Sequence, residues 1–304
     1  MEKGINIVEQ TLFFTATEEV SVLNTLENGR YLRRKIFNTF MTGLVTSLAA
    51  VSVATLALIL LAIMTNGISG ITPDLFLKDA IHGGIGHAIL GTLEILAVAG
   101  LMAIPLGIAT AIYLSEYGRG WLAEILHLVL DLLAQMPSIV IGLFVWALLI
   151  QTGIFRRSGI TGSFALAIIM LPIIARSVEE ILRLVPDHLR EAALALGTPR
   201  WRVTLGVVIP TVRPGIVTGV ILAMARAAGE TAPLLLTTLG NSFFQFNMLK
   251  AVPAVPLQLY EDVSNATDAS QLPRAWAAAL VLIILVAAIS VAVRMATGRI
   301  RYES

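Results

Sequence analysis

Several long runs of apolar residues, uncharged or nearly so, constrain the fold of this chain more than any other feature. A helix needs about 20 consecutive apolar residues to cross the hydrocarbon core of a bilayer. Only 13% of the residues are charged, whereas soluble domains average about 25%. We therefore expect an all-α integral membrane protein with about six transmembrane helices. The expected spans are Phe37–Met64, Ala88–Leu114, Trp121–Ile150, Thr161–Ala175, Val203–Thr237 and Pro273–Val293.

The polar segments between and around these runs divide the chain into three parts. Residues 1–35 form a polar N-terminal tail, residues 36–298 the membrane domain, and residues 299–304 a short C-terminal tail. The first apolar run follows the polar tail and is too long for the apolar part of a signal peptide, so we expect it to remain as an anchor. The fifth span is expected to bend near Pro210 and Pro214, because proline interrupts helical hydrogen bonding.

The lysines and arginines predict the orientation of the chain. With the N-terminus inside the cell, fifteen of them lie on the inner side, one, Arg226, lies within a span, and five lie outside. This positive-inside bias places both termini in the cytoplasm of a cell or inner membrane. The five outer residues are Lys78, Arg156, Arg157, Lys250 and Arg274.

The polar connection at residues 176–202 contains a short amphipathic helix. Pro186 and Asp187 suit a helix start, and Gly197 with Pro199 suits its end, so we expect a helix over Asp187–Leu196. A helix of under three turns is not stable alone. Its composition suits an interfacial helix or a docking element for a cytoplasmic partner, and composition alone favours the former. Its apolar face is expected to hold Leu189, Ala193 and Leu196, while Ala192, Ala193 and Ala195 allow another surface to approach closely.

Two charged residues lie well inside the fifth expected span. Arg226 and Glu230 are four residues apart, so on one helix they would share a face and could pair. Intramembrane charges normally face protein or water. The pair could hold a translocated oxyanion such as phosphate, or it could be a structural ion pair; the residues themselves favour neither. Glu94 is a second candidate for the path, and Asp131 suits a partly solvated structural role.

Some chemistries are excluded by what the sequence lacks. There is no cysteine, and therefore no disulfide, thiolate metal site or cysteine nucleophile. We expect no metal site, no catalytic residues and no cofactor bound by this chain. There is also no Gly-Lys dipeptide, and hence no phosphate-binding loop of the GxxxxGK[ST] type. Any ATP and magnesium that drive this protein must be used by another chain.

A motif in the polar connection resembles the loop signature of ABC importer membrane subunits. The pattern EAA-x3-G-x9-hydrophobic-x-hydrophobic-Pro is formed by Glu191, Ala192, Ala193, Gly197, Val207, Ile209 and Pro210. The resemblance implies the type I ABC importer permease fold and makes the short helix a coupling helix that docks on an ATPase subunit. The coupling residues would then be Asp187, Leu189, Glu191, Ala192, Ala193, Leu196 and Gly197.

Three further segments resemble the phosphate-importer branch of this family, the PstA-type subunits. They are Pro105–Tyr117, Pro137–Phe144 and RAAGETAPLL at Arg226–Leu235. The resemblance implies that Arg226 and Glu230 contribute to the phosphate path. It also implies four kinds of partner: a second, PstC-type permease subunit, a dimer of PstB-type ATPase subunits, an extracytoplasmic PstS-type phosphate-binding protein, and phosphate.

Three alternatives remain at this point. A permease subunit for another oxyanion, such as sulfate or molybdate, would use a buried arginine in the same way. An ATP-independent secondary transporter would use the Arg226–Glu230 pair for proton coupling, and it would be inhibited by collapse of the proton gradient. A membrane-embedded enzyme would require a nucleophile, base or metal cluster that the sequence does not offer.

Overall fold

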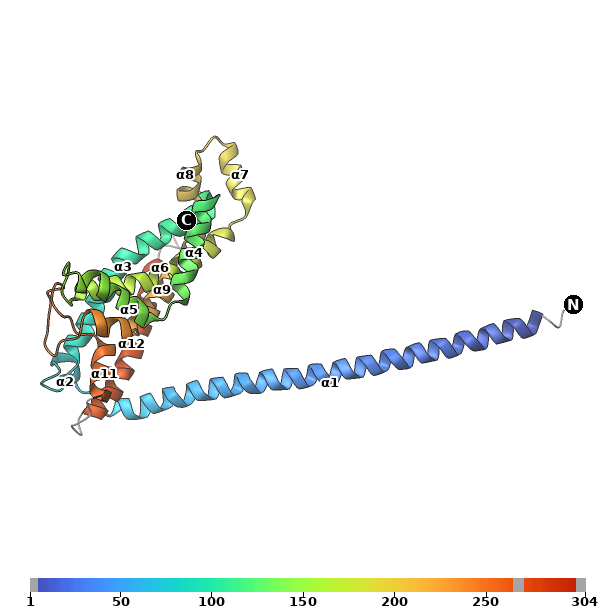
Figure 1. Cartoon of the computed structure of the whole chain (residues 1–304), viewed down its shortest axis with the longest axis horizontal. Coiled ribbons are helices and arrows are strands. Elements are labelled where there is room, and N and C mark those ends of the chain that lie inside the picture. Colours follow the sequence, from blue (N-terminus) through green and yellow to red (C-terminus); the bar gives the residue numbers. More distant parts are fainter. Residues whose placement is uncertain (1–4, 265–270, 299–304) are drawn as a thin grey trace. The chain divides into compact units, whose positions relative to one another are not determined.

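The computed structural model describes residues 5–264 and 271–298, with side chains at residues 33–264 and 271–295. Its described residues form helices joined by loops and contain no strand. Among these residues, five helices are long and apolar enough to span a membrane, and a bent pair brings the number to six. The expected all-α membrane architecture is confirmed. Figure 1 shows the helices and their labels.

Helix α1 (Ile5–Ile68) starts within the segment that was expected to be a polar tail. Its membrane-spanning part is Arg33–Ile68. The described side chains of this part are almost all exposed, including a long series of leucines, isoleucines and valines. Such a surface suits lipid. The chain up to Ala62 is one compact unit, and residues from Ile63 onward form the other.

The second unit is built around three helices that pack closely together. They are α3 (Gly86–Ile112), α6 (Gly159–Arg183) and α9 (Ile209–Ala228). Their shared core contains fully buried apolar side chains, including Leu96, Met170 and Ile174. A Cβ atom on Gly107 would lie 2.8 Å from the Cγ2 atom of Ile174, so only glycine lets α3 come this close to α6.

The third expected span is not one straight helix. It divides into α4 (Trp121–Gln135) and α5 (Ser138–Val145), which continues as a π-helical segment at Trp146–Gln151. The two halves are bent by 107°. The bend falls at Pro137, which cannot continue the hydrogen bonding of α4 and disfavours a helical conformation for the residue before it.

The fifth expected span is broken after Ala228. Pro210 lies in the first turn of α9, after a π-helical turn, and Pro214 lies inside the helix. The helix ends at Ala228, and α10 (Ala232–Thr237) follows with Pro233 in its first turn. Pro233 cannot donate a backbone hydrogen bond to the preceding turn, and Gly229 caps α9.

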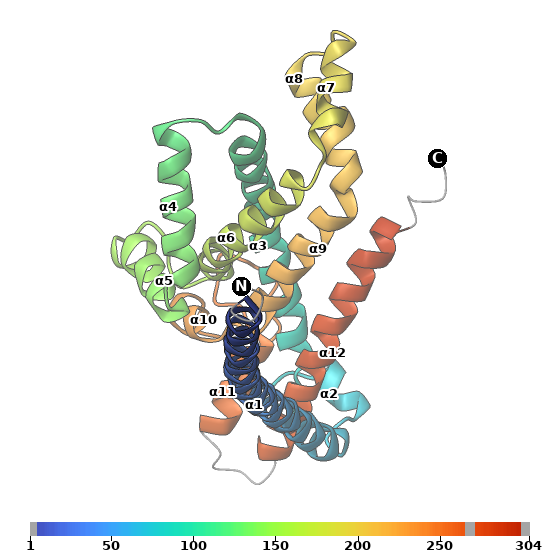
Figure 2. The ribbon, with the colours of Figure 1, turned by 90° about the vertical axis from the view of Figure 1, so that its right-hand side faces the viewer.

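The polar connection after the fourth span is shorter than expected, because α6 runs on to Arg183 instead of ending at Ala175. It then contains α7 (Asp187–Ala195), α8 (Arg200–Val203) and the π-helical turn Thr204–Val208. Figure 2 shows α7 and α8 projecting beyond the ends of the neighbouring helices.

Helices α2 (Pro73–Leu77) and α11 (Val255–Ser264) lie toward the end of the unit opposite to α7 and α8 (Figure 2). The segment between the fifth and sixth expected spans contains a helix, α11, whose face with Val255, Leu257 and Gln258 is buried. The sixth span is confirmed as a helix with Pro273 in its first turn. The C-terminal tail, 299–304, falls outside the described residues. The bounds are α2 Pro73–Leu77, the π-helical turn η1 Tyr113–Tyr117, α11 Val255–Ser264 and α12 Gln271–Gly298.

Candidate functional site

A cavity of about 390 Å³ lies where α4, α5, α6 and α9 meet. Among the described residues that line it, Arg226 is the only charged one. Ser138 adds a hydroxyl at the start of α5. The other lining residues are Leu133, Ala134, Met136, Ile141, Ile169, Pro172, Ile173 and Leu222. A mostly apolar cavity with one cation and one hydroxyl is suited to binding a small anion.

The two broken spans meet beside this cavity. A Cβ atom on Gly142 of α5 would lie 2.6 Å from the Cα atom of Pro233, so α5 and α10 are in close backbone contact. Non-helical backbone at membrane depth is tolerated only where it is buried in protein or lines a water-filled cavity. The break at Met136–Pro137 borders the cavity directly, and the break after Ala228 lies next to Arg226.

Arg226 and Glu230 come together, but not as two residues of one helix. Glu230 lies in the break between α9 and α10, beyond the last residue of α9, so the expected shared helical face is wrong. The Nη2 atom of Arg226 is 3.6 Å from the Oε1 atom of Glu230, and their side chains are 61% and 15% exposed. At this distance the two charges attract each other without a hydrogen bond. The guanidinium therefore keeps its donors available.

Glu94 does not join this pair. It is a half-buried residue of α3, and it is not among the residues that line the cavity. One of its carboxylate oxygens, Oε2, is buried and has no hydrogen-bond partner among the described residues.

A second charged cluster connects α4 to α6. Arg176 pairs with Asp131, whose side chain is 54% exposed, and donates a hydrogen bond of 2.9 Å toward the Nδ1 atom of His127. Glu179, only 4% exposed, lies 3.6 Å from Arg176 and accepts a 2.6 Å hydrogen bond from Arg183. Since Asp131 has both a partner and solvent access, its structural interpretation agrees with this geometry.

The short helix of the polar connection forms almost where it was predicted. Helix α7 covers Asp187–Ala195, and Gly197 has a φ of 77°, the left-handed conformation that ends a helix. Leu189 and Ala193 pack against the core, so one face of α7 is held by the membrane domain. Glu191 and Ala192 are exposed on the other face.

Leu196 does not share the face of Leu189 and Ala193. It lies beyond the last residue of α7, and its side chain is 86% exposed. The helix ends one residue earlier than expected, and the backbone of Leu196 (φ −78°, ψ 8°) already leaves the helical path. The exposed side chain of Leu196, just after α7, is available for contact with another protein.

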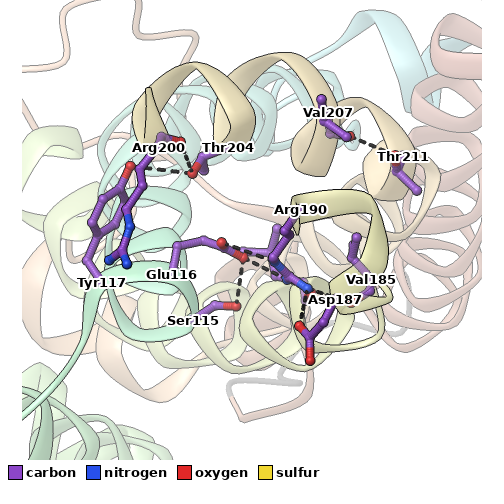
Figure 3. Close-up of polar contacts among 11 residues, drawn as sticks. Ser115, Glu116, Tyr117, Val185, Asp187, Arg190, Arg200, Thr204, Val207 and Thr211 are labelled. Carbon is purple, nitrogen blue, oxygen red and sulfur yellow. Dashed lines mark hydrogen bonds and ion pairs between the residues drawn. The ribbon is translucent and has the colours of Figure 1, made fainter. Parts of the chain in front are cut away.

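Arg190 holds α7 in place, and the sequence analysis missed it. Its guanidinium donates hydrogen bonds to Glu116, to Asp187 and to the carbonyl oxygens of Leu182 and Val185 (Figure 3). The hydrogen bond to Glu116, followed by the attraction of the nearby carboxylates, raises the pKa of Arg190 above its ordinary value. An arginine between Leu189 and Glu191 has no special sequence signal, because its partner is 74 positions away.

Comparison with known proteins identifies the family. Residues 103–302 match the family described as binding-protein-dependent transport system inner membrane component. The "Phosphate transport system permease protein PstA 1" of Mycobacterium tuberculosis is 43% identical over 236 residues, which cover 76% of this chain and 74% of that protein. This chain belongs to the PstA family of phosphate transport permeases. A second PstA, from Haemophilus influenzae, is 37% identical over 90% of this chain and 98% of its own length.

Membership of the PstA family agrees with the fold. A chain of the bacterial alginate ABC transporter, solved in complex with an alginate pentasaccharide-bound periplasmic protein, has a TM-score of 0.60 and 14% identity. The match covers 84% of this chain and 95% of that one. The expected ABC importer permease fold is thereby confirmed, and this PstA-family chain is a multi-pass membrane subunit rather than an enzyme.

Proposed function

We propose that this chain forms half of the membrane path of an ATP-driven phosphate importer. The observation that carries the proposal is the cavity with Arg226 as the charged lining residue, at the junction of two broken spans. A guanidinium can form two parallel hydrogen bonds with an oxyanion, which fits phosphate better than a point charge would. Glu230 balances the charge of Arg226 when the cavity is empty. No hydrogen bond between the two side chains has to break when phosphate binds to Arg226.

The energy for transport comes from ATP hydrolysed on separate, PstB-type subunits. Leu196 and the exposed Glu191–Ala192 face of α7 contact a groove on such a subunit, and Gly197 lets the chain turn back into α8. Leu189 and Ala193 transmit the movement to the core on which they pack. Closure of the ATPase dimer then turns the Arg226 cavity toward the outside.

The remaining partners complete an alternating-access cycle. A PstC-type permease covers the open side of Arg226, whose side chain is 61% exposed in the isolated chain. A PstS-type binding protein delivers phosphate to the outer face. In this proposal both termini and α7 lie in the cytoplasm, which the distribution of lysine and arginine supports.

The decisive experiment is ATP hydrolysis by the assembled complex in lipid vesicles. Binding protein is added with phosphate bound and then with sulfate bound. We expect stimulation by the phosphate-loaded form alone. An equal response to both would keep the importer and reject phosphate as its specific substrate. If no ATPase chain binds this subunit, the import proposal fails and a proton-coupled secondary transporter takes its place.

A further inference from the structure

The strongest polar contact between the cytoplasmic connection and the rest of the molecule joins Glu116 to Arg190. Glu116 belongs to the π-helical turn that ends α3, and Arg190 belongs to α7. The Nη2 atom of Arg190 donates a 2.8 Å hydrogen bond to Oε1 of Glu116, and its Nε atom donates a 3.3 Å hydrogen bond to Oε2. This two-pronged geometry fixes both the distance and the orientation of the two side chains.

Both partners are withdrawn from solvent. The side chains of Arg190 and Glu116 are 18% and 11% exposed. The same guanidinium also donates hydrogen bonds of 2.9 and 2.6 Å to the carbonyl oxygens of Leu182 and Val185, at the end of α6. One side chain therefore ties together the ends of α3 and α6 and the body of α7 (Figure 3).

A pocket of about 220 Å³ lies between α7 and α8 on one side and the turn that contains Glu116 and Tyr117 on the other. The second polar contact across it, between the hydroxyls of Tyr117 and Thr204, is long at 3.4 Å. The shorter Glu116–Arg190 contact therefore gives a direct polar link from α7 to the end of α3.

The π-helical turn puts Glu116 in reach of Arg190. The turn closes with a 2.5 Å hydrogen bond from the amide of Gly118 to the carbonyl of Tyr113. A Cβ atom on Gly118 would lie 3.0 Å from the Cα atom of Leu114, so the tight exit from this turn requires a small residue. Single π-helical turns often occur at functional sites.

We propose that the Glu116–Arg190 ion pair makes α7 and the end of α3 one mechanical unit, so that a push on α7 moves α3 as well as α6. The proposal rests on the import function above, since it requires an ATPase subunit that displaces α7. Glu116 and Arg190 are positioning residues in it, because neither touches the transported anion. Helix α3 packs on α6 at Gly107, and α6 lines the Arg226 cavity. A movement of α7 would therefore reach the cavity through α6 and would shift α3 together with it.

The first test is Glu116→Gln, which keeps the size of the side chain and removes its charge. Glu124→Gln is the matched control, because it makes the same change at an exposed glutamate in the first turn of α4, outside the coupling residues. The measurement is phosphate imported per ATP hydrolysed by the vesicle-reconstituted complex. We expect at least a fivefold fall for Glu116→Gln and an unchanged ratio for Glu124→Gln.

Two results of this test would overturn the proposal. One is an unchanged ratio in Glu116→Gln. The other is loss of ATPase binding in Glu116→Gln, which would mean that the pair only presents α7 for docking. Failure of the unaltered chain to bind any ATPase would instead reject the import function, so the two failures are distinguishable.

A second test uses the absence of cysteine from this chain. The double variant Glu116→Cys/Arg190→Cys is joined with a short thiol-specific cross-linker, and the unaltered complex treated with the same reagent is the control. In the double variant we expect the amount of phosphate imported per ATP hydrolysed to be low before cross-linking. After cross-linking it should return to at least half of the control value. Transport that stops on cross-linking would show that the two segments must separate, and would overturn the proposal.

Discussion

Arg226 combines a full charge with an exposed side chain inside a membrane-spanning helix. Its side chain is 61% exposed beside an otherwise apolar cavity. Placing an arginine at the centre of a bilayer costs about 2.5–3.5 kcal/mol on insertion scales, so such a residue normally faces a partner chain or water. We therefore expect the side chain of Arg226 to face an interior surface of the assembled complex and not lipid.

Replacing Arg226 by glutamine should abolish efficient transport without preventing assembly. A hydrogen bond to a charged group contributes about 1.5–3 kcal/mol, so we expect uptake at low phosphate concentration to fall about 10- to 100-fold. Arg213→Gln is the control, because Arg213 is exposed on the same helix outside the cavity. The measurement is phosphate uptake by vesicles, with co-purification of the ATPase as the check on assembly. Normal uptake by Arg226→Gln would reduce the arginine to a structural role.

Glu261 in α11 should make folding stability depend on pH. Burial, with the neighbouring Asp262 adding to it, raises the pKa of Glu261, and Arg274 partly opposes the shift. The folded state therefore holds its proton to higher pH than the unfolded state does. Protonated Glu261 contributes its full stabilisation below the ordinary pKa of about 4.5, and this stabilisation is lost as the pH rises through the raised pKa. We therefore expect the thermal-unfolding midpoint of Glu261→Gln to depend less on pH above 4.5 than that of the unaltered protein. The same dependence on pH in both proteins would contradict this.

At the scale of the elements, glycine decides how closely helices approach. Gly107 brings α3 against Ile174 of α6, and Gly142 brings α5 against Pro233 of α10. Small residues at helix interfaces are the usual means of close packing in membranes, because lipid supplies no hydrophobic force between helices. The contact at Gly142 joins the two broken spans beside the cavity, and the contact at Gly107 joins α3 to α6.

Gly107→Ala should destabilise the protein, whereas Gly100→Ala should not. The new methyl group at position 107 would lie 2.8 Å from Cγ2 of Ile174, but at position 100 the nearest side-chain atom is 3.5 Å away on the same helix. Overpacking costs about 1–3 kcal/mol, while alanine is favoured over glycine in a helix by up to about 1 kcal/mol. Thermal unfolding in detergent measures both. A lower midpoint for Gly100→Ala than for Gly107→Ala would contradict the argument.

Leu196→Ser should weaken binding of the ATPase subunit and leave the fold intact. Leu196 is 86% exposed at the tip of the connection, and Leu184, 77% exposed just before α7, is the matched control. Burying a leucine is favourable by about 1.5–3 kcal/mol, so we expect the affinity of the ATPase to fall about 10- to 100-fold. Co-purification at graded ATPase concentrations measures the effect. Equal binding by Leu196→Ser and the unaltered chain would remove Leu196 from the docking surface.

At the scale of the whole molecule, the charge distribution assigns each end of the bundle to one side of the membrane. In the cysteine-free chain, single cysteines report this assignment directly. A membrane-impermeant maleimide should label Phe246→Cys in intact cells and Ala195→Cys only after permeabilisation, since both positions are exposed. The reverse pattern would invert the orientation and reject α7 as a cytoplasmic docking helix.

The membrane class, the approximate number of spans and the position of the short helix α7 could be predicted from the sequence. These features depend on local properties, namely the length of the apolar runs and the turn residues at Pro186 and Gly197. The motif around Arg226 likewise indicated the family before any geometry was considered. Local signals of this kind do not depend on which segments meet in space.

The breaks in the spans and the pairing of charged residues could not be predicted from the sequence. Helix α9 ends at Ala228, and α10, which begins with Pro233 in its first turn, packs against α5 at Gly142. Glu230 therefore lies outside α9, and Glu94 does not line the cavity. Arg190 pairs with Glu116, 74 positions away in the sequence, because the π-helical turn that ends α3 lies beside α7. Contacts between distant segments depend on the packing of the whole core, and no local pattern in the sequence encodes them.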